Sequence, residues 1–368
     1  MARVILENVN KIYPSRHGPV HAVKDLSMTV DDGEFVALLG PSGCGKTSTL
    51  RMIVGLESIT SGAIRFDETV VNDLTPEQRN VAMAFETYAL YPNFTVAENL
   101  GFPLEVRGKS KAERAQEVER IARLLRIEHI LEHKPAQLSG GQQQRVSLGR
   151  ALIRDPAAFI LDEVMSHLDA HLKFQMLFEL KRIHQSVGKT TIYVTHDQVE
   201  ALGLASRVAV MNEAVLQQFG TRDDLYHRPA NRFVADFIGE PPTNFFTAEI
   251  LEQDGAVALQ VNGTGLSFRP DAGRSAALRR RNQRQVIVGM RPQNLSLNPI
   301  PGGGALGATV VLNEYLGEQS IVTFEANGTS FRVLAAPLVQ LTAGMAAVIH
   351  YRREDVMIFD PQTELLIR

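Results

Sequence analysis

A glycine-rich octapeptide carries the most specific chemistry in this sequence. Residues 40–47 read GPSGCGKT and match the phosphate-binding pattern G-x-x-x-x-G-K-[ST]. The glycines let backbone N–H groups wrap around phosphates, Lys46 reaches the outer phosphates, and Thr47 offers a hydroxyl to Mg²⁺. The loop therefore predicts a nucleoside triphosphate with magnesium as the ligand. The residues expected to bind it are Gly40, Pro41, Ser42, Gly43, Cys44, Gly45, Lys46, Thr47 and Ser48.

The residues on either side of this loop predict the elements that must position it. Residues 35–39 form a short apolar run typical of a buried strand, and residues 46–56 carry apolar side chains at helical spacing. A strand, a glycine-rich turn and a helix together aim a helix N-terminus at an anion. A glycine-rich turn without a ligand is the alternative, and this context argues against it.

Two carboxylates follow a second apolar strand pattern, at residues 159–161. Asp162 is placed to hold Mg²⁺ through water, and Glu163 to polarise the water that attacks the γ-phosphate. His196 follows the strand pattern at 191–195, where a lone histidine is more often structural. As a donor to a γ-phosphate oxygen, His196 would stabilise developing charge and orient Glu163 with its water. For Asp162 and Glu163, the alternative is that both are simply solvated acidic residues at the end of a strand.

A serine and two glycines open a further helix pattern. Residues 138–142 read LSGGQ and precede an apolar pattern over residues 146–153. A hydroxyl and free N–H groups at a helix start offer donors to an anion. This segment resembles the signature sequence of ATP-binding-cassette (ABC) ATPases. The resemblance implies that Ser139, Gly140, Gly141 and Gln142 contact the ATP of a partner subunit.

The other landmarks of that family follow in order. Residues 166–169 look like the D-loop, which ends in Asp169, and residues 195–197 look like the switch region that carries the γ-phosphate histidine, His196. Tyr13 fits the aromatic residue that stacks on adenine. The resemblance implies a head-to-tail dimer, with ATP held between the phosphate loop of one cassette and the signature segment of the other.

One position departs from the family pattern. The family usually places a glutamine after the third strand, and here Phe85 is followed by Glu86. A carboxylate can join Thr47 and Asp162 as a magnesium ligand, but it donates no hydrogen bond unless protonated. A second departure is Val164-Met165 in place of the usual proline and apolar pair. This chain is therefore either one half of a heterodimer with two unequal sites, in which the other ATPase keeps the glutamine, or a homodimer subunit in which Glu86 is a tolerated variant.

The spacing of apolar runs divides the chain into two parts. Strand patterns alternating with helix patterns predict a largely parallel α/β core. A helical insert includes residues 110–126, where Ser110 and Glu113 fit a capping box. After a proline-containing linker at 240–242, short β-type runs with glycine turns predict an all-β domain.

The expected fold is an α/β P-loop NTPase of the ABC type, followed by an all-β OB-like (TOBE) domain. The domain boundaries that we predict are 1–239, with the helical insert at about 87–156, and 240–368.

Composition excludes several classes of protein. The formal net charge of −3 argues against a nucleic-acid-binding protein, because such proteins need a basic surface. The arginine run at 279–281 is expected to lie in a solvated loop. The single cysteine, Cys44, rules out an intrachain disulfide. No signal-peptide core or uninterrupted apolar run of membrane-spanning length occurs in the sequence. We expect a soluble, cytoplasmic chain whose link to a membrane comes through partners.

Several segments resemble the maltose-importer branch of the ABC family, which takes up carbohydrates. They are residues 51–57, 88–92, 237–242, 288–292 and 359–360. The resemblance implies an ATPase at the cytoplasmic face of a bacterial inner membrane that powers import of a sugar, a polyol such as glycerol, or a related solute. Its partners would be a second cassette, identical or distinct, two permease subunits and, indirectly, a periplasmic solute-binding protein. Importers of polyamine, iron or phosphonate, and soluble ABC ATPases acting on ribosomes or DNA, are the alternatives.

Overall fold

The computed structural model describes residues 2–16, 18–84, 89–166, 168–253, 256–281 and 283–368. Phe85, Glu86, Thr87, Tyr88 and His167, to which the sequence assigned expectations, lie outside these residues. The chain divides into two compact units, Met1–Arg222 and Asp223–Arg368. The domain boundary expected at 239/240 stays a prediction.

Among the described residues, ten strands of the first unit form one sheet in the order β5-β4-β1-β2-β10-β9-β3-β8-β7-β6. The strands are β1 (Val4–Tyr13), β2 (Val20–Val30), β3 (Phe35–Leu39), β4 (Ser61–Phe66), β5 (Thr69–Val70), β6 (Val81–Ala84), β7 (Ala158–Asp162), β8 (Thr190–Thr195), β9 (Arg207–Asn212) and β10 (Val215–Gly220). The pairs β3–β8, β3–β9, β7–β8 and β6–β7 are parallel, which confirms the predicted parallel core. Strands β1, β2 and β4 add an antiparallel arm that the alternation of strand and helix patterns did not predict.

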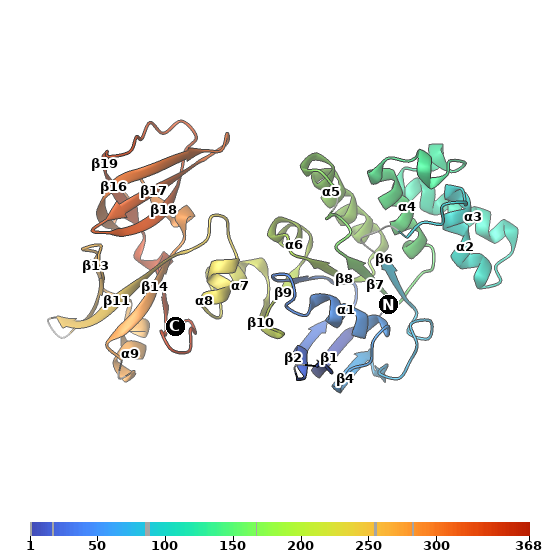
Figure 1. The fold of residues 1–368 in the computed structure, drawn as a ribbon, viewed down its shortest axis with the longest axis horizontal. Helices are drawn as coiled ribbons and strands as arrows, with labels where there is room; N and C mark the ends of the chain where they lie inside the picture. Colours follow the sequence, from blue (N-terminus) through green and yellow to red (C-terminus); the bar gives the residue numbers. More distant parts are fainter. Residues whose placement is uncertain (1, 17, 85–88, 167, 254–255, 282) are drawn as a thin grey trace. The chain divides into compact units, whose positions relative to one another are not determined.

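The helices of the first unit fall into two groups. Helix α1 (Lys46–Val54) lies between the parallel strands and the antiparallel arm, and its apolar side chains share one core with both (Figure 1). Helices α2 (Val96–Val106), α3 (Lys111–Leu125) and α4 (Gly140–Leu152) gather beside the edge strand β6, with short 3₁₀ turns η1 (Glu128–Ile130) and η2 (Pro135–Gln137) between them. Helices α5 (Ala170–Val187) and α6 (Gln198–Leu204) complete the unit.

The predicted capping box at the start of α3 is confirmed. The Ser110 hydroxyl accepts from the Glu113 backbone N–H at 3.3 Å, and the Glu113 carboxylate accepts from the Ser110 N–H at 2.9 Å. Hydrogen bonds from Ser110 lower the pKa of Glu113 to about 2. No helix in the described ranges is long and apolar enough to cross a membrane.

The second unit contains two five-stranded sheets, ordered β13-β12-β11-β14-β20 and β15-β19-β16-β17-β18. Their strands are β11 (Asn244–Gln253), β12 (Ala256–Val261), β13 (Ser267–Phe268), β14 (Gln285–Met290), β15 (Leu295–Ser296), β16 (Gly304–Tyr315), β17 (Ser320–Ala326), β18 (Thr329–Ala335), β19 (Ala346–Tyr351) and β20 (Met357–Phe359). Both sheets contribute to a single apolar core, in agreement with the predicted all-β domain. Short helices α7 (Arg222–His227) and α8 (Arg232–Phe237) precede the sheets, and the 3₁₀ turns η3 (Pro292–Asn294) and η4 (Arg353–Asp355) lie among the strands.

The prediction that the arginine run lies in a loop is wrong. Arg279 and Arg280 end helix α9 (Ala272–Arg280), whose start is capped by the Asp271 carboxylate accepting from the Arg274 N–H at 2.9 Å. Only Leu278 is buried in this helix, so its sequence carries almost no apolar periodicity. Arg281 follows the helix and forms an ion pair with Asp360 at 2.6 Å.

A buried arginine joins α7 and α8 to the strands of the second unit. Arg291 is 2 % exposed and donates to the backbone carbonyls of Tyr226, Ala235 and Ile238. Its guanidinium lies over the Tyr226 ring, 4.1 Å from the centroid. Burial lowers the pKa of Arg291 to about 10. Peptide carbonyls and an aromatic face thus replace the solvation of this cation.

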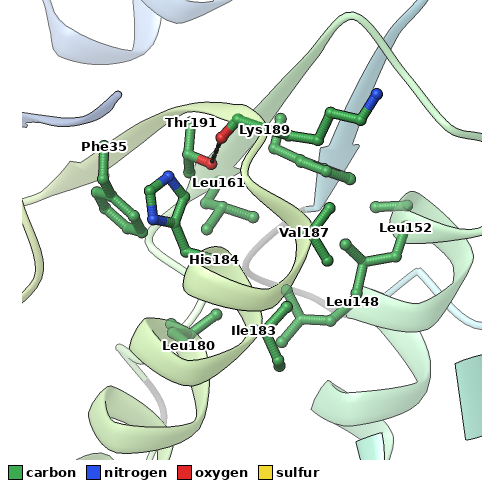
Figure 2. Close-up of a pocket in the computed structure, with 12 residues that line it drawn as sticks. Phe35, Leu148, Leu152, Leu161, Leu180, Ile183, His184, Val187, Lys189 and Thr191 are labelled. Carbon is green, nitrogen blue, oxygen red and sulfur yellow. Dashed lines mark hydrogen bonds between the residues drawn. The ribbon is translucent and has the colours of Figure 1, made fainter. Parts of the chain in front are cut away.

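A small apolar cavity of about 30 Å³ lies where α4 and α5 pack on the sheet (Figure 2). Its volume matches a single water, which is too small for a metabolite. His184 of α5 faces it beside Phe35, with ring centroids 5.1 Å apart, and its Nε2 has no partner among the described residues. Burial lowers the pKa of His184. This histidine is therefore a core residue held in its neutral form.

We predict that His184 makes the first unit sensitive to acid. A depressed histidine pKa means that the unfolded chain binds the proton first, so stability is lost as the pH falls below about 6.5. His184→Leu should therefore lose less unfolding free energy than the parent between about pH 7.5 and pH 5.5. Urea titrations followed by helical circular dichroism measure this, with His21→Leu, at an exposed position, as the control. Equal pH slopes for parent and His184→Leu would contradict the prediction.

Candidate functional site

Strand register brings three predicted site segments to one edge of the sheet. In the parallel core, Leu39 of β3 pairs with Thr195 of β8, and Asp162 of β7 pairs with Val194 of β8. The phosphate loop, Glu163 and His196 follow the carboxyl ends of these three strands directly. Ligands of open α/β sheets bind at this edge, because the loops after neighbouring parallel strands meet there.

The backbone of the phosphate loop needs glycine at several positions. Gly43 and Gly45 have φ angles of +80° and +103°, a region that other residues rarely adopt. A Cβ on Gly45 would lie 2.2 Å from the Ala22 carbonyl oxygen, and one on Gly40 would lie 2.3 Å from that of Met211. The loop is thus pressed against β2 and the end of β9, which fixes its curvature.

Lys46 supplies a buried positive charge inside this loop. The residue is 5 % exposed, and its Nζ donates to the carbonyl oxygens of Gly40 at 2.8 Å and Pro41 at 3.0 Å. No carboxylate within the described ranges pairs with it. Cys44 lies beside it, and burial raises the pKa of the Cys44 thiol while Lys46 opposes that shift. A buried cation without a counter-ion is stabilised by an anion, which is the role expected of phosphate.

The start of α1 adds neutral donors to the same place. Gly45 caps the helix without a side-chain hydrogen bond, and the first turn holds no acidic residue. The backbone N–H groups of Thr47 and Ser48 find no acceptor in the part of the chain that the structure describes. These free donors and the helix dipole favour a bound anion. The cradle therefore fits the phosphates of a nucleotide.

The donors available for magnesium are few and are oxygen atoms. Thr47 is exposed at the first turn of α1, and Asp162 ends β7, against which α1 packs. Among the described residues, no group of three or more His, Cys, Asp or Glu side chains could hold a metal ion. This donor set suits Mg²⁺, which is commonly held by one or two protein oxygens together with substrate phosphates and water.

The predicted catalytic pair lies in contact. His196 Nδ1 is 3.3 Å from Glu163 Oε2, and the two side chains are 53 % and 26 % exposed. Glu163 has a positive φ of 46°, which re-aims the chain as it leaves β7. Its backbone N–H donates to the Val194 carbonyl at 3.0 Å, so the turn is tied to β8. Two partly exposed groups that can transfer or accept protons thus face solvent at the strand edge.

A charged network that the sequence did not reveal holds the segment after β8. The buried Glu200 carboxylate accepts from the hydroxyls of Tyr193 and Thr195, and Lys173 Nζ lies 3.2 Å from it. Lys173 also pairs with Asp197 at 3.2 Å. Burial raises the pKa of Tyr193 well above its usual value, and the neighbouring charge of Glu200 adds to this shift. The segment that carries His196 is therefore held by β8 on one side and by Lys173 of α5 on the other.

Tyr13 has a partner that the sequence gave no reason to expect. Its hydroxyl donates to the Glu57 carboxylate and lies 3.4 Å from the hydroxyl of Ser48, next to the phosphate loop. Lys11 lies over the ring, 4.8 Å from the centroid, and also pairs with Glu57 at 3.8 Å. Burial raises the pKa of Tyr13, and the hydrogen bond to Glu57 raises it further. These contacts fix the ring in one orientation beside the loop.

The signature segment belongs to a different part of the unit. Ser139 caps α4, and its hydroxyl accepts from the Gln142 N–H at 3.4 Å while Gln142 Oε1 accepts from the Ser139 N–H at 2.9 Å. Ser139, Gly141 and Gln142 line a cavity of about 280 Å³ with residues of α5 and Leu168. No phosphate-loop residue lines that cavity. Within one chain, the structure does not join the two predicted nucleotide contacts into one cavity.

The remaining predicted site residues have separate positions. Asp169 caps α5, where its carboxylate accepts from the Leu172 N–H at 3.0 Å, and Gly140 opens α4. Glu86, the expected magnesium ligand, and His167 of the expected D-loop lie outside the described residues. Sequence spacing did not predict the roles of Glu57 and Glu200, because each carboxylate accepts a hydrogen bond from a residue in another secondary-structure element.

Comparisons with known proteins agree across the whole chain. Residues 23–166 match the family described as ABC transporter, and residues 288–359 match the TOBE domain. The chain is 43 % identical to the sn-glycerol-3-phosphate import ATP-binding protein UgpC of Ruegeria sp. (strain TM1040), over 99 % of this chain and 98 % of that protein. It is 42 % identical to the trehalose/maltose import ATP-binding protein MalK of Thermococcus litoralis, over 99 % of each.

A solved structure resembles part of the chain. It is the dimeric post-hydrolysis state of the ATP-binding cassette MJ0796, bound to ADP and Pi. The TM-score is 0.53 at 31 % identity, and the match covers 59 % of this chain and 98 % of that one.

We predict that Glu57 supports nucleotide binding through Tyr13. Glu57→Ala removes the acceptor of the Tyr13 hydroxyl, and a single net hydrogen bond of about 1 kcal/mol corresponds to roughly a fivefold weaker affinity for ATP. Titration with a fluorescent ATP analogue measures the change. Glu68→Ala, at a side chain that is 93 % exposed, is the control and should bind like the parent. Unchanged affinity in Glu57→Ala would show that the carboxylate does not support the ring.

Proposed function

This chain belongs to the ABC transporter family as an import-type ATP-binding subunit, and we propose that it hydrolyses ATP to power uptake of a sugar, a polyol such as glycerol, or a related solute. The observation that carries the proposal is the end-to-end similarity, over 99 % of the chain, to two import ATP-binding proteins. UgpC is named for sn-glycerol-3-phosphate and MalK for trehalose and maltose, and all three are small polyhydroxylated solutes.

Hydrolysis by this site relies on positioning and on charge stabilisation. Lys46 and the free N–H groups at the start of α1 hold the phosphates, and Tyr13 supports the adenine. Glu163 orients and activates the attacking water, and His196, 3.3 Å from it, donates to the γ-phosphate. The contact between Glu163 and His196 supports this division of roles.

Magnesium has its expected ligands on two neighbouring elements. The hydroxyl of Thr47 and the carboxylate of Asp162 would hold the ion, and Glu86 is a third proposed ligand outside the described residues. Mg²⁺ held there would supply positive charge that neutralises the outer phosphates. All of the proposed protein ligands are oxygen atoms at one edge of the sheet, and Mg²⁺ prefers oxygen ligands.

The site is proposed to be completed by a second cassette, arranged head to tail. In this arrangement Ser139, Gly140, Gly141 and Gln142 of one chain cover the ATP held by the loop of the other, and Asp169 lies near the contact. The separation of the signature cavity from the phosphate loop within one chain supports this arrangement. The structural neighbour MJ0796 is itself described as a dimer.

A groove beside β6 is the proposed contact for the membrane subunits. It has a volume of about 420 Å³ and is lined by apolar side chains, including Val106 at 69 % exposure, and by three arginines, Arg107, Arg150 and Arg154. Burial lowers the pKa of Arg150 and of Arg154. Glu77 also lines the groove, but one exposed and two partly buried arginines outnumber it, so the groove suits a short cytoplasmic helix that carries an acidic residue. This contact would hold the chain peripherally at the cytoplasmic face of the inner membrane.

The partner cassette is either a second copy of this chain or a distinct paralogue with a glutamine at the position of Glu86. Purification of the assembled transporter and a count of its distinct cassette subunits decide between the two. Two copies of this chain would reject the heterodimer. The solute is proposed to be selected by the permeases and the solute-binding protein.

We predict that Glu163→Gln separates binding from hydrolysis. The amide keeps the shape of the side chain but cannot accept a proton from water, so kcat should fall about 10²- to 10⁴-fold. ATP affinity should stay within about twofold of the parent value, since the phosphate contacts remain. Phosphate release and equilibrium ATP binding measure the two quantities. A variant that hydrolyses ATP at the parent rate would remove Glu163 from the chemistry.

A further inference from the structure

A buried glutamine on α4 reaches from the signature helix to the catalytic turn. Gln144 is 1 % exposed and lies five residues beyond the Ser139 cap, about 7.5 Å along the helix. Its Nε2 donates to the backbone carbonyl of Val164 at 2.5 Å. Val164 directly follows Glu163 in the chain. One side chain thus links the helix that is proposed to cover the partner's ATP to the residue beside this chain's own general base.

The turn that Gln144 contacts is tightly organised. The Glu163 carbonyl accepts from the Ser166 N–H at 3.1 Å and from the Ser166 hydroxyl at 2.9 Å. Val164 and Met165 are buried at 3 % and 0 % exposure, so this turn cannot shift without moving its core contacts. Because Glu163 holds a positive φ, a small change in the turn would re-aim its carboxylate. A displacement of the Val164 carbonyl would therefore change the orientation of the Glu163 carboxylate.

Neighbouring side chains of α4 make different contacts. Gln143 Nε2 donates to the Pro135 carbonyl at 3.0 Å, and Arg145 donates to the Leu125 carbonyl at 3.2 Å, both within the helical insert. Farther along the helix, Leu148 and Leu152 line the same apolar cavity as Leu161 of β7 (Figure 2). Helix α4 is therefore packed on the insert and on the catalytic strand, and Gln144 provides a polar contact to the turn that follows this strand.

The second polar atom of Gln144 is unsatisfied. Its Oε1 is buried and has no hydrogen-bond partner among the described residues. A buried acceptor left unpaired is costly, and a residue kept only for packing would avoid that cost with an apolar side chain of the same size. The amide is explained by the hydrogen bond that it donates to Val164, since only the N–H end of the amide can pair with a carbonyl.

We infer that Gln144 is a positioning residue that couples the signature segment to Glu163. When Ser139–Gln142 engage the ATP of the partner subunit, α4 shifts with them, and the Gln144 amide passes this shift to the Val164 carbonyl and so to the general base. Each chain then aligns its own Glu163 in response to nucleotide held by the other. The inference rests on the proposed function, because it requires ATP hydrolysis by a composite dimer.

Gln144→Met tests this coupling, because methionine has nearly the same length but donates no hydrogen bond. The expected result is that kcat of the assembled transporter falls about ten- to hundredfold, as for a small misplacement of a catalytic group. ATP affinity, measured with a fluorescent analogue, should stay within about twofold of the parent value. Gln283→Met is the matched control, because this amide also donates a hydrogen bond and has a buried Oε1 without a partner among the described residues, but it lies in the second unit; its kcat should stay within about twofold of the parent value.

Gln144→Glu adds a readout that a purely structural role would not give. A protonated carboxyl donates an O–H to the Val164 carbonyl, whereas a carboxylate repels it. Burial favours the protonated form, so kcat relative to the parent should rise as the pH is lowered from about 8 to about 6. This comparison remains informative even where Gln144→Met folds poorly, because the same purified variant is measured at both pH values.

The outcomes separate this inference from the proposed function. A parent transporter that hydrolyses no ATP overturns the proposed function. A parent that hydrolyses ATP, together with a Gln144→Met variant of unchanged kcat, overturns only the coupling. A fall in kcat that is matched by an equal loss of ATP affinity, or a Gln144→Glu variant that follows the parent's pH profile, also overturns it.

Discussion

The register of three parallel strands is the constraint on which the rest of the site depends. Pairing of Leu39 with Thr195 and of Asp162 with Val194 sets the phosphate loop, the Glu163 turn and His196 at one edge of the sheet. These strands are apolar and buried, so a change of register would expose core side chains. The strand register therefore serves both the stability of the core and the alignment of the proposed catalytic groups. The buried, unpaired charge of Lys46 then gives this edge its preference for an anion.

The structure divides the chemistry between two regions of the first unit. The loop, the carboxylates and the histidine belong to the parallel core, whereas Ser139–Gln142 begin a helix of the insert and line another cavity. We propose that a second chain completes the site by contributing the part that one chain keeps separate. The Glu200–Lys173 network and the Gln144 contact hold the catalytic segments from two sides. The network holds the segment that carries His196, and the Gln144 contact links the Glu163 turn to the signature helix.

Local signals predicted much of this fold. The buried strand at 35–39 has the predicted bounds, and the capping box of Ser110 and Glu113 forms as its spacing indicates. The contact between Glu163 and His196 also agrees with the sequence, because strand-end residues of a parallel sheet meet. Helix α9 was missed because one buried leucine gives no apolar period. Glu57, Glu200 and Gln144 were missed because their partners are set by tertiary packing, which residue spacing does not encode.

The central claim is that one ATP site is built from two chains, and a complementation assay tests it most directly. Lys46→Ala removes the loop cation, and Gly141→Asp places a negative charge in the signature segment, where a Cβ meets only Leu172 at 3.8 Å. Each variant alone should be inactive. Mixed dimers hold one doubly defective site and one intact site, so an equal mixture should recover about a quarter of the parent ATPase activity. The assay uses the assembled transporter with every cassette subunit that it contains, and for a distinct paralogue the Gly141→Asp change is made at the matching position of that subunit. A mixture as inactive as its components would contradict the account, because sites contained within single chains cannot complement each other.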